Sequence, residues 1–519
     1  MKSNQDNFPF YSWVPRPVGI LILMFMFVPP TFSGGAYMSN LNEMVGGLGI
    51  WTEDIQLAGF FTSIGMCLFP PFMIRFLQAR RVKQTYLYCF ALLFLLNYIC
   101  ATTVSLPILL LTCLLTGFVR VIVMLNCTFT LAPYLTGMDT LSMFTMKEEP
   151  SEEIQYQLER KRTFLMPVLY FYILLISQAS NLLTAWFAYE YQWQQAYYVV
   201  MGFLLFAMLL VVSTMPDEEK KSRYKVEHVL IPEMAFMTVL LCSLSYIAVY
   251  GKTLDWLDST SIRFAIALFL FSLGGFLYVT LQKREKHYLP LEIFRFRNIW
   301  MSMLLFFLCM LFNSASMFIG AFAKLSTPIN NLQSASLSSW AIVGCFIGLL
   351  FSLLLVVRKV RFRTVFIVGF LLMAAANLYM YFQYQSISQF DKMILPTVLN
   401  YAGLLILYAL VAAFGMKSLP SRYLVTFVFL MIWMRNSIAP FVGSSIYSNW
   451  LNERQQHYIT RLVNDTPLTD QTPVLPMKMR ITKQATLLAM KDISGKTVSL
   501  LLCTTLVVFL LPYHRKETT

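Results

Sequence analysis

The stretch PILLLTCLLTGFVRVIVMLNCT, which runs from Pro107 to Thr128, decides the class of this protein. Arg120 is its only charged residue. At about 1.5 Å of rise per residue, a helix of this length crosses a hydrocarbon core roughly 30 Å thick. Similar runs recur along all 519 residues, of which 57% are hydrophobic and 13% are charged. A soluble domain needs more charge to cover its surface, so we expect an integral membrane protein in a lipid bilayer.

Fourteen apolar runs have the length of a transmembrane helix. The sequence therefore predicts an all-α integral membrane fold with fourteen spans, which begin near Pro17, Ile55, Gln84, Pro107, Thr163, Trp193, Leu230, Thr260, Ile299, Leu337, Thr364, Pro396, Tyr423 and Ile493.

The basic residues predict the orientation of these spans. Most of the 40 Lys and Arg residues lie in the two tails and in alternate connectors, while the remaining short connectors carry few. Cytoplasmic loops are enriched in Lys and Arg, so we expect both termini in the cytoplasm. The net charge of +14 thus reflects membrane orientation and does not indicate nucleic-acid binding. The basic clusters are Arg75/Arg80/Arg81/Lys83, Lys147/Arg160/Lys161/Arg162, Lys220/Lys221/Arg223/Lys225, Lys283/Arg284/Lys286/Arg295/Arg297, Arg358/Lys359/Arg361/Arg363 and Lys417/Arg422.

Residues typical of metal sites and of enzymes are poorly placed. All nine cysteines fall in apolar runs, which favours packing over disulfides or metal binding, and none of the four histidines lies at membrane depth. The Gly-Lys-Thr triplets at Gly251 and Gly495 lack the upstream glycine of a phosphate-binding loop. We therefore expect no metal, no cofactor and no enzymatic activity.

Two connectors are longer than turns. The connector from Met138 to Arg162 is predicted to be cytoplasmic and to contain a short surface helix after Ser151. The connector from Asn449 to Lys491 is predicted to lie outside and to be irregular, since Pro467, Pro473 and Pro476 interrupt it. It either contacts a periplasmic partner or only joins two spans.

Three motifs suggest a family. The first is the turn Gly251-Lys252-Thr253-Leu254-Asp255-Trp256, and the second is Leu289-Pro290-Leu291-Glu292-Ile293-Phe294-Arg295-Phe296-Arg297-Asn298. The third is Arg435 followed by the small residues Gly443, Ser444 and Ser445. Together they resemble the fourteen-span drug:proton antiporter branch of the major facilitator superfamily.

The resemblance implies an N-terminal six-helix bundle in residues 1–228, an inserted helix pair in 229–284, and a C-terminal six-helix bundle in 285–519 with a periplasmic loop at about 449–492. It implies a secondary active transporter that exports amphipathic small molecules across a bacterial inner membrane by alternating access. By the same resemblance, a periplasmic adaptor and an outer-membrane channel are candidate partners.

The N-terminal half departs from the family pattern. Pro29 stands where span 1 of the family has an intramembrane Asp, and Cys113 stands where span 4 has an Arg. The connector Pro71–Arg81 lacks the family's glycines and Asp, and Ser177–Thr184 lacks the Gly-Pro signature of span 5. The alternative function is thus a non-transporting membrane scaffold or sensor that kept the fold and lost proton coupling.

Arg120 and Arg435 lie deep in spans 4 and 13, without an Asp or Glu at the same depth. An arginine costs about 2.5–3.5 kcal/mol at the centre of a membrane helix, so it faces protein or a water-filled cavity. The pair predicts a net-positive central cavity that favours anionic or zwitterionic amphiphiles. The alternative is a structural role, with each guanidinium bonded to helix carbonyls or polar side chains.

Further polar and helix-breaking residues are candidates for a substrate pathway. Ser177, Gln178 and Asn181 form a polar stripe with Ser180 and Thr184, and Asn126 and Asn313 are isolated polar residues; each also suits helix packing. Glu233 is a candidate for proton coupling or, alternatively, an acid at a helix N-terminus. A break or kink in span 1 is predicted at Pro29, Pro30, Gly34 and Gly35.

Overall fold

The computed structural model describes residues 9–37, 40–69, 81–136, 152–217, 231–282, 291–326, 330–385, 388–417, 419–465 and 474–511. Several predicted features lie outside these residues. They are most of the basic clusters between 70 and 80, 137 and 151, 218 and 230, and 283 and 290, the greater part of the Met138–Arg162 connector, and the prolines Pro467 and Pro473.

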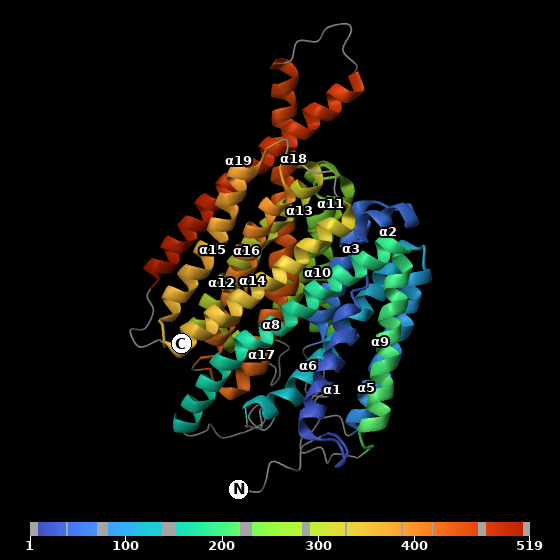
Figure 1. Cartoon of the computed structure of the whole chain (residues 1–519), viewed down its shortest axis with the longest axis vertical. Coiled ribbons are helices and arrows are strands. Elements are labelled where there is room, and N and C mark those ends of the chain that lie inside the picture. Colours follow the sequence, from blue (N-terminus) through green and yellow to red (C-terminus); the bar gives the residue numbers. More distant parts are fainter. Residues whose placement is uncertain are drawn as a thin grey trace.

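The described elements are helices (Figure 1). Twelve of them are long and apolar enough to cross a membrane, which confirms a multi-pass α-helical architecture. Helix α1 (Arg16–Phe32) is apolar but has only 17 residues, and α3 (Thr52–Leu68) has the same length. A total of fourteen spans requires both of these short helices, so that number stays a prediction.

The first group of helices ends at residue 214. Helix α3 packs along α6, α5 packs against α6 and α9, and α1 lies against α6, α8 and α9. Buried apolar side chains of α1, α5, α6 and α9 form one continuous core. Besides α1 and α3, the group contains α2 (Leu41–Leu48), α5 (Val82–Thr102), α6 (Leu106–Thr136), α8 (Glu152–Glu190) and α9 (Trp193–Thr214).

A helix pair follows the first group. Helices α10 (Ile231–Tyr250) and α11 (Thr260–Leu281) pack against each other, and α10 also contacts α3 and α18. Between them, Asp255 and Trp256 adopt positive φ angles of 52° each. The Trp256 indole donates a 3.1 Å hydrogen bond to Asn449 of α18. The pair therefore touches helices from both groups.

The second group carries the largest core. Helix α16 packs against α14, α15 and α12, while α19 packs against α15 and α18. The residues of α16 from Ala402 to Met416 are all buried, which places α16 at the centre of this group. The members are α12 (Arg297–Asn313), α13 (Met317–Ser326), α14 (Asn331–Val357), α15 (Phe362–Gln383), α16 (Ile394–Met416), α17 (Ser421–Trp433), α18 (Ala439–Asp465) and α19 (Val474–Leu510).

The two groups meet along two seams. Helix α8 of the first group packs on α14 and α16 of the second, and α3 packs on the turn between α17 and α18. Figure 1 shows α8 crossing between the two groups.

The segment predicted as an irregular outside loop is largely helical. Helices α18 and α19 continue to Asp465 and from Val474, and they project beyond the other helices (Figure 1). Asp492 of α19 pairs with Arg454 of α18 at 3.3 Å. A segment that is too polar to span a membrane can still be helical. Here two such helices pair with each other outside the membrane. We call the end of the molecule with this projection the hairpin end, and the end where α16 stops and α17 starts the opposite end.

Two glycines allow α3 and α6 to cross at unusually short range. A Cβ atom on Gly117 of α6 would fall 1.9 Å from the carbonyl oxygen of Thr62, and one on Gly65 of α3 would fall 2.0 Å from that of Leu114. Small residues at such crossings let helix backbones approach in a membrane, where apolar burial against lipid gives little driving force. The crossing holds the first group together.

Candidate functional site

A cavity of about 190 Å³ lies between the two groups of helices. Its walls come from α1, α3, α6 and α8 on one side and from α16, α17 and the turn after α17 on the other. Met416, the last residue of α16, and Leu424, near the start of α17, both line it. The cavity therefore lies toward the opposite end of the molecule, away from the hairpin.

Most of the cavity wall is apolar and adaptable. Five methionines line it, together with the aromatic side chains of Phe27, Phe129, Tyr170 and Phe427. Methionine side chains are flexible and polarizable, which suits contact with apolar groups of varied shape. Charged side chains enter this wall at two positions, Arg162 and Arg435.

Arg435 is positioned by an irregular helical turn. Residues Met434–Ile438 form a π-helical turn between α17 and α18. Pro440 is the second residue after this turn, and its missing N–H and bulky ring oppose a regular α-helix at this point. Single π-turns of this kind are frequent at functional sites. Here the turn places Arg435 in the cavity wall.

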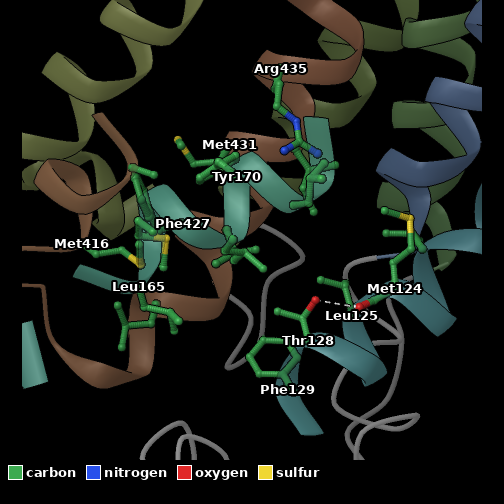
Figure 2. Close-up of a pocket in the computed structure, with 18 of the residues that line it drawn as sticks. Met124, Leu125, Thr128, Phe129, Leu165, Tyr170, Met416, Phe427, Met431 and Arg435 are labelled. Atoms are coloured by element: carbon green, nitrogen blue, oxygen red, sulfur yellow. Dashed lines mark hydrogen bonds between the residues drawn. The ribbon is translucent and has the colours of Figure 1, made fainter. Parts of the chain in front are cut away.

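Among the described residues, the Arg435 guanidinium contacts the side chains of Asn436 and Tyr170. Its Nε donates a 2.9 Å hydrogen bond to the neighbouring Asn436 side chain, and its Cζ lies 5.8 Å from the centroid of the Tyr170 ring. Figure 2 shows Arg435 at one end of the pocket, above Tyr170 and Met431. No salt bridge to Arg435 occurs among the described residues. A cation over an aromatic face in an apolar cavity is a suitable binding group for an anion.

Arg162 is the second cation of the cavity. In the sequence, Arg162 belongs to a basic cluster that predicts only a cytoplasmic connector. It shares a face of α8 with Met166, Leu169 and Ile173, all of which line the cavity. Their spacing of four, seven and eleven residues follows a helix face. That periodicity was visible in the sequence. Glu159, one turn earlier, interacts electrostatically with Arg162.

Arg120 does not belong to the described wall of the cavity. Its Nε is buried and makes no hydrogen bond within the described part of the chain. The guanidinium interacts electrostatically with Tyr37 and Arg435. The two predicted arginines thus lie near each other across the two groups, but only Arg435 reaches the cavity.

At the hairpin end the two groups are joined by polar and aromatic contacts. Gln56 of α3 donates a 2.8 Å hydrogen bond to Ser444 of α18, and the rings of Phe60 and Phe441 contact each other at a tilt of 33° with centroids 4.3 Å apart. Asn330, which precedes α14, donates a 2.8 Å hydrogen bond to Tyr189 of α8. The groups are therefore held together at the hairpin end, and the cavity separates them toward the opposite end.

The residues of the predicted polar stripe of α8 differ in burial. Gln178 is buried and donates a 3.3 Å hydrogen bond to the Tyr401 hydroxyl of α16, whereas Ser177 is half-buried and Asn181 is exposed. Asn126 is buried on α6, and the amide oxygen of Asn313 accepts a 3.1 Å hydrogen bond from Asn400. None of these residues is among those that line the described cavity.

Glu233 and the residues of the predicted span 1 break lie elsewhere. Glu233 is fully buried in the first turn of α10, outside the cavity wall. Helix α1 continues through Pro29 and Pro30 and ends at Phe32, and Gly34 and Gly35 lie in non-helical backbone. Gly35 has a φ of +74°, and a Cβ there would lie 2.8 Å from the Cys113 sulfur. This backbone packs on α3 and α6.

The fold and the cavity define a class: a multi-pass helical membrane protein with two packed groups of helices and a one-sided cavity between them. Solved structures with a similar fold include a peptide transporter POT in complex with sulfate (TM-score 0.57, 12% identity, 97% of each chain covered). Others are a variant of the nucleoside transporter NupG (0.54, 12%, 94% of this chain and 99% of that one) and a proton dependent oligopeptide transporter (0.55, 13%, 94% and 97%).

These structures show that the chain has a fold like that of the solved nucleoside and peptide transporters. They do not support the drug:proton antiporter branch in particular, to which the three motifs pointed. No protein-family model matches the sequence, and no curated protein sequence matches it.

Proposed function

We propose that this protein is a secondary active transporter that carries amphipathic molecules with an anionic group across the membrane by alternating access. The observation that carries the proposal is the cavity: both groups of helices line it, it lies toward one end, and contacts close the other end. A site between two bundles that rock against each other is the geometry of alternating access.

The chemistry of the wall supports the substrate class. Methionines and aromatic rings suit an apolar body, and Arg435 suits an anionic group, whose charge the described protein does not supply at that point. Arg120 adds positive potential nearby without lining the cavity. A cationic drug would meet repulsion there, so we expect it to be a poor substrate.

The proposal includes a membrane arrangement. Counting α1 and α3 with the twelve longer helices gives fourteen spans, with α10 and α11 as the inserted pair between residues 229 and 284. The basic connectors favour a cytoplasmic position for the opposite end of the molecule. The cavity would then face the cytoplasm, which suits export across a bacterial inner membrane, and the α18–α19 hairpin would face the periplasm and a candidate adaptor.

The test is transport by the purified protein in liposomes. A decyl sulfonate is a suitable probe, because its permanent charge limits leakage through the bilayer, and uptake is measured with and without a pH gradient. The parent protein is expected to take up the probe. A folded Arg435→Gln variant is expected to bind it about ten- to a hundredfold less tightly, since a charge-assisted hydrogen bond contributes roughly 1.5–3 kcal/mol.

Two controls complete the test. Arg435→Lys keeps the charge and loses the planar fork, so an intermediate affinity is expected. Arg358→Gln changes an exposed arginine outside the cavity wall and is expected to transport like the parent. If the parent moves no anionic amphiphile under any gradient, the transporter proposal fails and the scaffold or sensor function remains.

A further inference from the structure

The cavity carries one cation at each end of an apolar wall. Arg435 lies over the ring of Tyr170, which belongs to α8. Arg162 is on α8 as well, eight residues before Tyr170. At about 1.5 Å per residue, those eight residues span roughly 12 Å along the helix. Arg162 and Arg435 thus mark two ends of one binding space, and both line it.

The described wall between these two cations is largely apolar, and the hydroxyl of Thr128, which also lines the cavity, donates to the carbonyl of Met124. On α8 the wall is formed by Leu165, Met166 and Leu169, and the facing side of α17 contributes Phe427 and Met431. Figure 2 shows Leu165, Phe427 and Met431 on the path that leads away from Arg435. Burial of hydrocarbon along such a wall is favourable, whereas a polar group placed there would lose its hydration without a partner.

We infer that the preferred substrate is a rod-shaped dianion, with an anionic group at each end of an apolar chain that spans the distance between Arg435 and Arg162. This inference rests on the proposed transport function and adds a length and a second charge to its substrate class. A carbon–carbon bond advances a zigzag chain by roughly 1.3 Å, so 12 Å corresponds to about ten bonds. Because both arginine side chains are long and movable, chains of about ten to fourteen carbons are expected to fit.

The two ends are not equivalent. Both arginines are half-buried, but Arg435 meets no described acidic residue, whereas Arg162 has Glu159 one turn away. Glu159 already offsets part of the charge of Arg162, so a second anionic group contributes less there than at Arg435. We expect Arg435 to set overall affinity and Arg162 to set the preference for a second anionic group.

The experiment measures competition in proteoliposomes. Unlabelled alkane-α,ω-disulfonates of four, ten, twelve and sixteen carbons compete against uptake of labelled decyl sulfonate, and each is matched by the monosulfonate of equal length. For the parent, the ten- and twelve-carbon disulfonates are expected to compete about three- to fivefold better than the matched monosulfonates. The four-carbon disulfonate is expected to show no such advantage, which separates chain length from net charge.

Variants locate the second contact. Arg162→Gln is expected to abolish the advantage of the disulfonates and to weaken competition by monosulfonates less than Arg435→Gln does. Arg160→Gln changes an exposed arginine two residues away that does not line the cavity, and the advantage is expected to persist. Arg435→Gln is expected to weaken both series.

The outcomes separate the two proposals. If the parent takes up the labelled monosulfonate but shows no preference for long disulfonates, or if Arg162→Gln keeps that preference, the dianion inference is wrong and the transport proposal stands. If no probe is taken up at all, the transport proposal fails and the inference falls with it.

Discussion

Adding a single methyl group at the crossing of α3 and α6 should separate two helices that the fold needs in contact. In the Gly117→Ala variant, the new Cβ would lie 1.9 Å from the carbonyl oxygen of Thr62 and 3.1 Å from the amide nitrogen of Met66. Both are backbone atoms, so neither can move aside as a side chain does. The helices must move apart locally by more than an ångström.

Two opposing effects decide the magnitude. Alanine is favoured over glycine in a helix interior by about 1 kcal/mol. Overpacking a tight contact costs typically 1–3 kcal/mol and occasionally more, and a contact with backbone on a neighbouring helix belongs at the upper end. We expect a net loss of about 2 kcal/mol. For a unit of roughly 200 residues this corresponds to an apparent melting temperature about 4–8 °C lower.

The cysteines supply the assay. Seven of the nine are buried, including Cys67 on α3 and Cys113 on α6, so a dye that fluoresces on reaction with thiols reports melting. The matched control is Gly202→Ala on α9, where a new Cβ would meet nothing within 4 Å and only the gain in helix propensity remains. If Gly117→Ala melts at or above the temperature of Gly202→Ala, the close crossing is not needed for stability and the reasoning is refuted.

Three further predictions concern coupling, topology and partners. Glu233→Gln is expected to lose transport driven by a pH gradient and to keep probe binding, because the carboxyl is fully buried in α10; unchanged gradient dependence would exclude it as the coupling group. Cysteines introduced at Lys161 and Gln456 are expected to react with impermeant reagents from opposite sides of the membrane. If both cysteines react from the same side, the fourteen-span topology is wrong. A crosslinker at the exposed residue Lys478, with Arg461 as a second site, is expected to capture a periplasmic adaptor, whereas full export in cells after deletion of Pro467–Pro476 would argue against one.

The membrane class and the positions of most helices were predictable from the sequence, because uninterrupted apolar runs have few other uses. The motif residues also proved informative locally. Asp255 and Trp256 form the tight turn between α10 and α11, and Ser444 joins α18 to α3. The family branch stays a prediction, since short motifs can be shared by distant proteins with one fold.

Hydropathy failed where helices leave the membrane. The segment from Asn449 to Asp465 is too polar to span a bilayer, but it remains helical and pairs with α19 through Arg454 and Gln455. A rule that equates apolar with helical assigns such a segment to a loop. Pro476 did not break α19 either, because it lies in the first turn, where its missing N–H is not needed.

The cavity was only half predictable. Depth in a span singled out Arg435 and Arg120, but depth alone does not say which way a side chain faces. The π-helical turn at Met434–Ile438 shifts the helical phase around Arg435, and nothing in a regular 3.6-residue repeat anticipates that shift. The role of Arg162 was not apparent because the basic cluster forms one feature in the sequence, although Arg160, Lys161 and Arg162 point in different directions around α8.

The projecting α18–α19 hairpin turns any rocking of the second group into a displacement that can be measured outside the membrane. Both of its helices continue from the membrane bundle, where α18 packs on α12 and α19 packs on α15. The seventeen residues from Asn449 to Asp465, at about 1.5 Å each, make an arm of roughly 25 Å. A rotation of about 15°, as occurs between moving subunits, would move its end by roughly 7 Å. The position of the hairpin therefore reports the conformational state of the second group. A spin label near the end of the hairpin, or a bound protein, would detect the displacement directly.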